Sequence, residues 1–162
     1  MTTTASPTAL SPTDLSTRYL EAGGITDKVF NPMVAWLTRR GLSLAGSRVL
    51  EVRGRTSGEW RATPVNPLRL DGAEYLVAPR GHTQWVRNLR AAGGGRLRKG
   101  RRVEEFTADE LVDAEKPEVL RAYLAKWKWE VGAFFDGIGA DASDDELLAV
   151  AAGYPVFRIT RS

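Results

Sequence analysis

Apolar and polar residues alternate along three short segments in the first half of the chain, which predicts β-strands. These segments are Val49 to Arg53, Ala62 to Leu70 and Tyr75 to Ala78. Asp71-Gly72, between the last two segments, is a hairpin signal because both residue types tolerate a positive φ. Pro64 and Pro67 cannot donate ladder hydrogen bonds, so the segment that holds them is predicted to be an edge or bulged strand.

The remaining pattern adds helices and two further strands. Helices are predicted from Asn31-Pro32 to about Gly41 or Gly46, and over Gln84 to Ala92 with a stop at Gly93-Gly94-Gly95. The capping box Thr107-Ala108-Asp109-Glu110 predicts the start of a further helical region, followed by a helix over Glu118 to Trp129. A last helix is predicted over Leu147 to Ala152, after the capping box Ser143-Asp144-Asp145-Glu146. Strands are predicted over Leu97 to Phe106 and Tyr154 to Thr160. Antiparallel strands interrupted by helices, without βαβ alternation, indicate an α+β domain around a barrel or small sheet.

The domain organisation is predicted to be simple. Residues 1–24 begin with a Thr/Ser/Pro/Ala-rich stretch and are expected to form a flexible leader, with a helical turn around Asp14 to Leu20. Residues 25–162 are expected to form a single domain. The leader lacks an apolar signal core, and no apolar run is long enough to cross a membrane, so a cytoplasmic protein is expected.

The net charge of +3 conceals an asymmetry along the chain. Residues 1–103 hold 17 Lys and Arg against 7 Asp and Glu, a net +10, whereas residues 104–162 hold 6 against 13, a net −7. Most of the basic residues are Arg, whose planar fork suits phosphate and carboxylate groups. Either an anionic small ligand or a nucleic acid fits this half of the chain.

Composition excludes some chemistry. The chain has no Cys, so disulfide frameworks and Cys-based metal sites are ruled out, and its single His makes a catalytic zinc site improbable. We therefore predict no metal site.

Two motifs about twenty residues apart are candidates for a binding cradle. Gly54-Arg55-Thr56-Ser57-Gly58 joins two predicted strands as a tight turn, where hydroxyls and guanidinium groups can meet an anion. Arg80 precedes a predicted short helix on which Trp85 and Asn88 share a face. Each motif alone also fits an ordinary hairpin turn or a core Trp, but like charges at Arg53, Arg55, Arg61, Arg80 and Arg87 would repel unless an anion neutralised them.

Together these motifs resemble the deazaflavin-dependent nitroreductase family of actinobacteria, whose members use reduced coenzyme F420. The residues that carry the resemblance are Gly54-Arg55-Thr56-Ser57-Gly58, Arg61, Thr63-Pro64-Val65, Ala78-Pro79-Arg80-Gly81, Trp85 and Asn88-Leu89. It extends over about Phe30 to Ile159. It implies a split β-barrel like that of FMN-binding pyridoxamine-phosphate oxidases, with flanking helices and with the coenzyme in a groove at the side of the barrel.

The resemblance also implies roles for residues. Arg55, Thr56, Ser57 and Arg61 would hold the phosphate and the glutamate tail of the coenzyme. Pro64, Val65, Ala78, Pro79 and Arg80 would line the ring and the ribityl chain, and Trp85 and Asn88 would complete the site. Many relatives have Lys where this chain has Thr56, which replaces a cationic contact with a hydroxyl.

The resemblance implies an oxidoreductase that transfers a hydride to a quinone, an enone or a nitroaromatic compound. Such an acceptor becomes anionic, so a nearby donor or cation would help. Candidate residues of the substrate pocket are Asn66, His82, Tyr123, Trp127, Trp129 and Phe134. The sequence assigns no catalytic residue, the proton can also come from water, and both a monomer and a homodimer remain open.

Three alternatives remain. The same fold could bind FMN or haem in place of the deazaflavin. The basic run Arg96 to Arg102 could instead form a nucleic-acid-binding face, although alternation on a strand favours a solvated face, and no nucleic acid is expected as partner. Peripheral membrane contact through a helix over Asn31 to Leu44 is compatible with quinone reduction.

Overall fold

The computed structural model describes residues 15–19, 48–131, 135 and 137–162, with the side chains of residues 128–131 left out. The helix predicted from Asn31-Pro32, and with it the membrane-surface helix, lies outside the described residues. Within the described part of the chain, no helix is long and apolar enough to cross a membrane.

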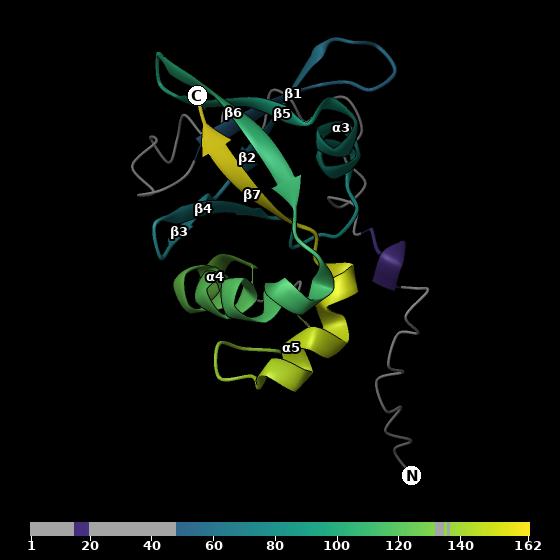
Figure 1. The fold of residues 1–162 in the computed structure, drawn as a ribbon, viewed down its shortest axis with the longest axis vertical. Helices are drawn as coiled ribbons and strands as arrows, with labels where there is room; N and C mark the ends of the chain where they lie inside the picture. Colours follow the sequence, from purple (N-terminus) through teal and green to yellow (C-terminus); the bar gives the residue numbers. More distant parts are fainter. Residues whose placement is uncertain (1–14, 20–47, 132–134, 136) are drawn as a thin grey trace.

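Among the residues that the structure describes, seven antiparallel strands form one sheet, which is the main layer of the fold (Figure 1). The strands are β1 (Arg48–Arg53), β2 (Trp60–Val65), β3 (Leu68–Leu70), β4 (Ala73–Val77), β5 (Gly94–Lys99), β6 (Arg102–Glu110) and β7 (Val156–Arg161). Their order across the sheet is β2-β1-β5-β6-β7-β4-β3. Each neighbouring pair is hydrogen-bonded, so chain neighbours such as β1 and β2 form hairpins while β7 returns to pair with both β6 and β4.

The strand order requires the sheet to curl. β2 and β3 occupy its two opposite edges, yet only Asn66 and Pro67 separate them along the chain. In a flat sheet, edges six strand spacings apart would lie about 29 Å from each other, whereas three Cα steps reach about 11 Å at most. The two edges therefore approach each other, and the predicted α+β split β-barrel is confirmed. The segment predicted as one strand over Ala62 to Leu70 is two edge strands, as its prolines indicated.

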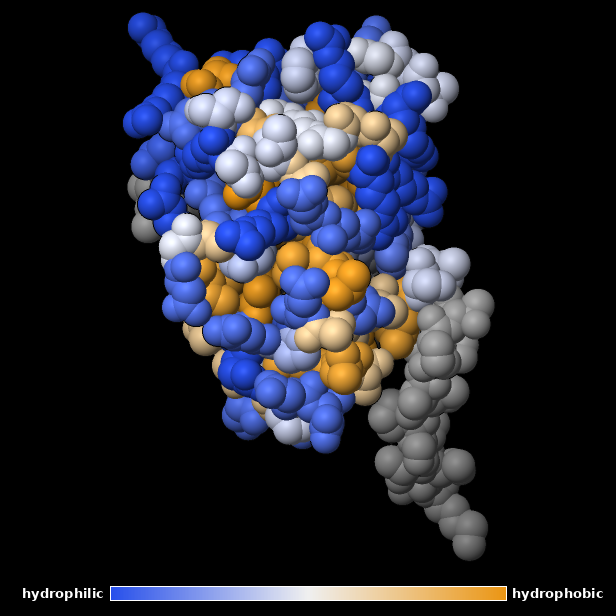
Figure 2. Space-filling model, in the orientation of Figure 1, coloured by the Kyte–Doolittle hydropathy of each residue, from blue (hydrophilic) through white to orange (hydrophobic). Residues whose placement is uncertain are grey.

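In the described part of the chain, three α-helices flank the barrel. They are α3 (Gln84–Ala92), α4 (Lys116–Val131) and α5 (Asp144–Val150), joined by the 3₁₀ turns η2 (Asp113–Glu115) and η4 (Ala151–Gly153). α3 packs beside β1 and β5, while α4 and α5 lie together against the β3–β4 side (Figure 1). Figure 2 shows apolar atoms gathered where the sheet meets α4 and α5, with polar atoms around them.

The described side chains form two apolar core clusters. One fills the barrel beneath α3 and includes Leu50, Val52, Val86, Leu89, Leu97, Phe106 and Phe157. The other joins α4 and α5 to the sheet and includes Leu120, Tyr123, Leu124, Trp127, Phe135, Leu147 and Tyr154. Burial of these side chains is the main source of the fold's stability.

Local signals predicted several elements correctly. The helix predicted over Gln84 to Ala92 is α3, and Gly93 ends it in the left-handed region with φ 73°. Asp71 and Gly72 form the predicted hairpin turn, both with positive φ. Ser143 caps α5 by accepting a hydrogen bond from the Glu146 amide at 3.2 Å.

The capping box at Thr107 does not begin a helix. Residues Thr107 to Glu110 belong to β6 and pair with β7, so long-range pairing overrides the local capping signal. The single strand predicted over Leu97 to Phe106 is the hairpin of β5 and β6, which turns at Gly100. Gly94 begins β5, and glycine is needed there because a Cβ would approach the Phe106 carbonyl oxygen to 2.4 Å.

Residues 15–19 lie within the predicted flexible leader, but the structure docks them on the domain. Leu15 and Arg18 are buried, and Tyr19 forms an isolated β-bridge with Gly81. The helical turn predicted around Asp14 to Leu20 is present at Leu15 and Ser16.

Candidate functional site

The turn between β1 and β2 is closed by its own hydrogen bonds. The Gly54 amide donates to the Glu59 carbonyl at 2.7 Å, and the Gly58 amide donates to the Gly54 carbonyl at 2.8 Å. Gly58 has φ 70°, which favours glycine at this position. The Ser57 hydroxyl accepts a hydrogen bond from the Glu59 amide at 3.2 Å. The turn therefore presents Arg55, Thr56 and Ser57 in a defined conformation.

Asn88 of α3 fixes the orientation of Arg55. The Asn88 Oδ1 atom accepts from the Arg55 backbone amide at 3.1 Å and from Arg55 Nη1 at 2.9 Å. Arg55 Nη1 also donates to Gln84 Oε1 at 2.9 Å. Asn88 is only 5 % exposed, so its two hydrogen bonds to Arg55 join the turn to α3 at a buried position. The described polar partners of the Arg55 guanidinium are neutral amides, which leave its charge uncompensated.

A groove of about 540 Å³ lies between this turn, the first half of β2 and α3. Its lining residues are Tyr19, Val52, Gly54, Arg55, Thr56, Ser57, Arg61, Ala62, Thr63, Arg80, Gln84, Trp85 and Asn88. Three of them are arginines, and none of the described lining residues is acidic. The groove therefore combines a positive charge with the aromatic surfaces of Tyr19 and Trp85, and it suits an anionic ligand with a planar part.

The groove brings together seven of the eleven residues predicted to bind the coenzyme: Arg55, Thr56, Ser57, Arg61, Arg80, Trp85 and Asn88. The other four lie elsewhere along the same elements. Pro64 and Val65 are at the far end of β2, Ala78 is buried in the barrel core, and the Pro79 carbonyl accepts a hydrogen bond from Arg18.

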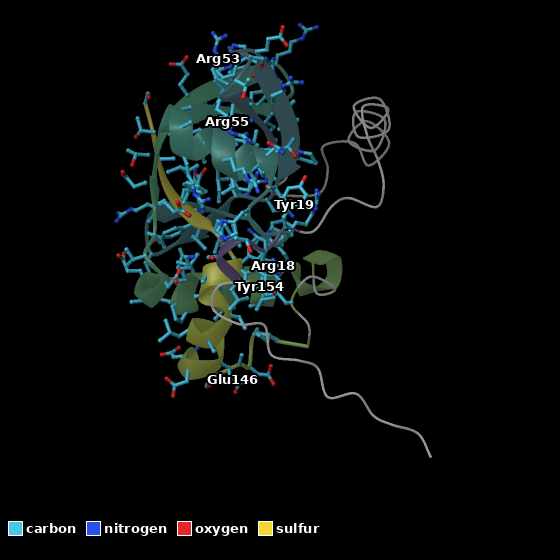
Figure 3. The ribbon with its side chains drawn as sticks, turned by 90° about the vertical axis from the view of Figure 1, so that its right-hand side faces the viewer. Arg18, Tyr19, Arg53, Arg55, Glu146 and Tyr154 are labelled. Carbon is cyan, nitrogen blue, oxygen red and sulfur yellow. The ribbon has the colours of Figure 1, made fainter. Side chains whose placement is uncertain are left out.

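Three further arginines of the predicted basic segments, Arg53, Arg87 and Arg96, face aromatic rings. The Arg53 guanidinium lies 4.4 Å from the Trp60 ring centroid, and that of Arg96 lies 3.6 Å from it. Arg87 lies 5.9 Å from the Tyr19 ring centroid. In Figure 3, Arg53 appears beyond Arg55 at the end of the barrel, and Tyr19 appears on the opposite side of Arg55.

The described residues among those predicted for the substrate pocket do not line one cavity together. Tyr123 and Trp127 are 2 % and 3 % exposed and pack in the core under α4, so their aromatic surface serves the fold. His82 Nε2 donates to the Ala152 carbonyl at 3.0 Å, because a carbonyl can only accept. Asn66 is half-buried in the link between β2 and β3. The Trp129 side chain and Phe134 lie outside the described residues.

Three polar or aromatic groove residues were not among the residues predicted to bind the coenzyme: Tyr19, Thr63 and Gln84. Gln84 precedes Trp85 on α3 and lies one turn before Asn88. This spacing places Gln84 and Asn88 on the same helix face, which could have identified Gln84 as a groove residue. Tyr19 lies in the predicted leader, where no local pattern pointed to a site.

A second basic cavity, of about 440 Å³, lies at the other end of β1. We call it the far mouth, and it is lined by Arg48, Pro67, Arg69, Glu74, Leu97, Lys99, Arg102, Glu104, Lys126 and Arg161. Arg161 binds both carboxylates, at 2.7 Å from Glu74 and in a close pair with Glu104. Arg69 and Arg102 also pair with these carboxylates, at 3.4 Å and 2.6 Å.

Ionisation in the far mouth follows this pairing. The hydrogen bond from Arg161 is the main cause that lowers the pKa of Glu104 below its ordinary value. Burial acts to lower the pKa of Arg161, but its hydrogen bonds to Glu74 and Glu104 outweigh burial and raise that pKa. Glu74 and Glu104 thus offset part of the charge of Arg69, Arg102 and Arg161, although the lining as a whole holds six cationic and two acidic residues.

The predicted basic run over Arg96 to Arg102 is also partly neutralised. Arg96 and Arg98 both pair with Glu51, at 2.8 Å and 3.0 Å. These pairs favour the interpretation of this run as a solvated strand face over its interpretation as a surface that binds nucleic-acid phosphates.

Solved structures of similar fold exist. One is an F420-H2 dependent reductase, 20 % identical over 72 % of this chain and 95 % of that chain, with a TM-score of 0.48. Another is a domain-swapped dimer, 18 % identical over 80 % and 98 %, with a TM-score of 0.51. A third is a conserved hypothetical protein of Mycobacterium tuberculosis, 16 % identical over 85 % and 81 %, with a TM-score of 0.46. At such identities these similarities concern the fold alone.

Among curated proteins, none matches the chain. The comparison with protein families gives the decisive result, because residues 34–130 match the F420H(2)-dependent quinone reductase family. This match spans more than half of the chain and includes the turn, β2 and α3. It confirms the resemblance and the coenzyme that the two motifs implied. The chain therefore belongs to the F420H(2)-dependent quinone reductase family.

Proposed function

We propose that the groove between the β1–β2 turn and α3 holds reduced coenzyme F420, and that the enzyme reduces a small quinone. Family membership makes the protein an F420-dependent oxidoreductase. The observation that carries the position of the coenzyme is the charge of the groove, which three arginines and no described acidic residue line.

The residues of the groove fit this coenzyme. The coenzyme joins a planar deazaflavin through a ribityl chain to a phosphate and a glutamate tail, so it needs both cations and apolar surface. Arg55 and Arg61 supply charge beside the hydroxyls of Thr56 and Ser57, and Trp85 supplies an aromatic surface. The volume of about 540 Å³ is in the range of small-molecule sites.

In this proposal the protein contributes binding, orientation and charge. When bound, the reduced coenzyme supplies a hydride. Asn88 holds Arg55 in place before the ligand arrives, so little side-chain entropy is lost on binding. Arginines stay protonated at all relevant pH values, and their positive field favours an acceptor that becomes anionic as it is reduced.

The proton for the reduced acceptor comes from water in this proposal. His82 is the single histidine, but its Nε2–H is engaged by the Ala152 carbonyl. The described residues that line the groove include no carboxylic acid and no histidine.

Quinones are the preferred acceptors because the matched family is described by quinone reduction. Enones and nitroaromatic compounds form the second group, since each also becomes anionic on accepting a hydride. Steady-state assays of the enzyme with reduced F420 and one acceptor of each class would rank them. A higher kcat/KM for the nitroaromatic compound than for the quinone would contradict the preference.

Titration with coenzyme F420, followed by intrinsic Trp fluorescence, tests the position of the coenzyme. Trp85 lines the groove, so binding is expected to quench its emission. If the Trp emission is not quenched at coenzyme concentrations of roughly tens of micromolar, the proposal is contradicted. The visible spectrum of freshly purified protein separates the alternatives, because bound FMN and bound haem absorb differently.

We further propose that the enzyme acts in the cytoplasm, as a monomer or a homodimer, on a small-molecule substrate. Paired arginines on β5 support a surface without nucleic-acid affinity. Sedimentation with liposomes would decide whether the chain also contacts membranes, and size-exclusion chromatography with light scattering would give the oligomeric state.

A further inference from the structure

Tyr19 reaches the groove from a segment outside the family match. The match begins at residue 34, whereas Tyr19 belongs to Leu15–Tyr19, which we call the strap. Tyr19 nevertheless lines the same groove as Arg55, Arg80 and Trp85. One wall of the groove is therefore supplied by a part of the chain that does not define the family.

Arg18 anchors the strap to the domain. Its Nη1 donates to the Pro79 carbonyl at 2.9 Å and to the Gly153 carbonyl at 3.0 Å. Its guanidinium lies 4.3 Å from the ring centroid of Tyr154, in cation–π geometry. Figure 3 shows Arg18 and Tyr154 close together beneath Tyr19. Because Arg18 is 7 % exposed, these are interactions of a buried charge, and breaking them would be costly.

The backbone of the strap is bound as well. The Arg18 carbonyl accepts from the His82 amide at 2.6 Å, and Tyr19 forms a β-bridge with Gly81. A Cβ on Gly81 would lie 2.2 Å from the Arg18 carbonyl oxygen, and Gly81 has φ 91°. A Cβ on Gly153 would likewise lie 2.9 Å from Leu15 Cδ2. Two glycines thus permit the close approach of the strap.

Docking of the strap places Tyr19 beside the parts of the site that carry charge. The loop that holds Gly81 also carries Arg80 into the groove and leads directly into α3. On α3, the Arg87 guanidinium lies 5.9 Å from the Tyr19 ring centroid. The ring is half-buried, so it keeps an accessible surface on the groove side.

We propose that the strap completes the coenzyme groove and that the aromatic ring of Tyr19 contacts the bound coenzyme and slows its dissociation. This inference rests on the proposed function. Aromatic surfaces favour planar ligands through stacking and area burial, and neither effect needs the Tyr hydroxyl. The ring is therefore the part of Tyr19 that matters.

Two substitutions separate the ring from the hydroxyl. Tyr19→Ala is expected to raise the Kd for oxidised coenzyme F420 by about tenfold, mainly through faster dissociation in stopped-flow fluorescence. Tyr19→Phe is expected to restore binding to within about twofold of wild type, because the ring remains. Val112→Ala, on an exposed side chain away from the groove, is the control.

A third variant tests the strap without changing a groove side chain. Leu15→Ala, which removes a buried side chain of the strap, is expected to displace the strap, to weaken coenzyme binding by about the same factor as Tyr19→Ala, and to add little when the two are combined. Increased cleavage of intact protein near residue 18 by a limiting amount of trypsin would report the displacement. Full additivity of the two variants would overturn the coupling.

The outcomes distinguish the two proposals. If wild type binds the coenzyme and Tyr19→Ala binds it equally well, the role of Tyr19 is overturned and the coenzyme site stands. If Tyr19→Phe weakens binding as much as Tyr19→Ala, the hydroxyl rather than the ring is responsible, and the inference fails. If wild type itself does not bind coenzyme F420, both proposals fail.

Discussion

The two ends of β1 hold arginine-rich cavities of similar size, but their charges are balanced differently. In the far mouth, Glu74 and Glu104 pair with Arg69, Arg102 and Arg161. In the groove, the described partners of Arg55 are the amides of Gln84 and Asn88, and no described lining residue is acidic. Counting arginines alone would treat both cavities as anion sites.

This contrast indicates that the hydrogen-bond partners of an arginine, more than the number of basic residues, decide whether its charge is available to a ligand. A carboxylate partner satisfies both the hydrogen bonds and the charge of an arginine, so the pair serves the fold. An amide partner satisfies geometry and leaves the charge available to a ligand.

Removal of a groove arginine has the largest expected effect. Arg55→Ala and Arg61→Ala are each expected to weaken coenzyme F420 binding by about tenfold to a hundredfold, since a hydrogen bond to a charged group contributes about 1.5–3 kcal/mol. Fluorescence titration measures the Kd. Arg69→Ala and Arg102→Ala, in the far mouth, are the matched controls, and a similar loss in either would erase the distinction between the cavities.

Placing a carboxylate beside Arg55 would give the groove an arginine–carboxylate pair like those of the far mouth. Asn88→Asp keeps an oxygen that accepts from Arg55 but neutralises its charge, so we expect an unchanged or higher Tm with about tenfold weaker coenzyme binding. Asn88→Ala is the comparison variant, because it loses both hydrogen bonds to Arg55. It is expected to lower the Tm in addition to weakening coenzyme binding. Wild-type affinity in Asn88→Asp would show that the ligand does not use the charge of Arg55.

Adding charge at the tip of the turn has a smaller expected effect. Thr56 is exposed and lines the groove, so Thr56→Lys is expected to tighten coenzyme binding by about threefold, and less at high salt. Thr56→Gln, which is long but neutral, should not reproduce the gain. An equal gain with Gln would assign the effect to length instead of charge.

The smallest expected effect concerns the pH dependence of the far mouth. Because Arg161 lowers the pKa of Glu104 in the folded protein, the pair stabilises the fold above the ordinary carboxylate pKa and loses this contribution as pH falls through the lowered pKa. Glu104→Gln should therefore lower the Tm slightly at pH 7, and the difference should shrink below about pH 4. The coenzyme affinity of Glu104→Gln at pH 7 should match that of wild type. A Tm difference that grows as the pH falls would contradict the lowered pKa of Glu104.

The elements that the sequence predicted well are those with local signals. α3 ends at Gly93 with the expected left-handed glycine, and Asp71-Gly72 makes the expected turn. Ser143 caps α5 through the Glu146 amide. In each case one or two residues determine the backbone conformation, so neighbouring residues suffice for the prediction.

Long-range pairing explains the elements that were missed. Thr107 to Glu110 has a helix-start pattern, but pairing with β7 makes it strand. The positions of Pro64 and Pro67 indicated an edge strand, while the closure of the barrel between β2 and β3 depends on pairing across the whole sheet. Such pairing leaves little trace in a local window.

The candidate site was predicted in part for a related reason. The turn and α3 carry their own motifs, and the structure brings them to one groove. Tyr123 and Trp127 share a helix with a plausible aromatic face, but periodicity cannot tell a core face from a pocket face, and both are core. Tyr19 depends on docking of a short segment through Arg18, which composition does not reveal.

The central claim is that the groove keeps its positive charge for the phosphorylated coenzyme. The most direct measurement compares the Kd of wild-type protein for coenzyme F420 with that for the same deazaflavin without phosphate and glutamate tail. We predict that the complete coenzyme binds at least about a hundredfold more tightly, since it can engage both Arg55 and Arg61. Equal affinities for the two compounds would contradict the account.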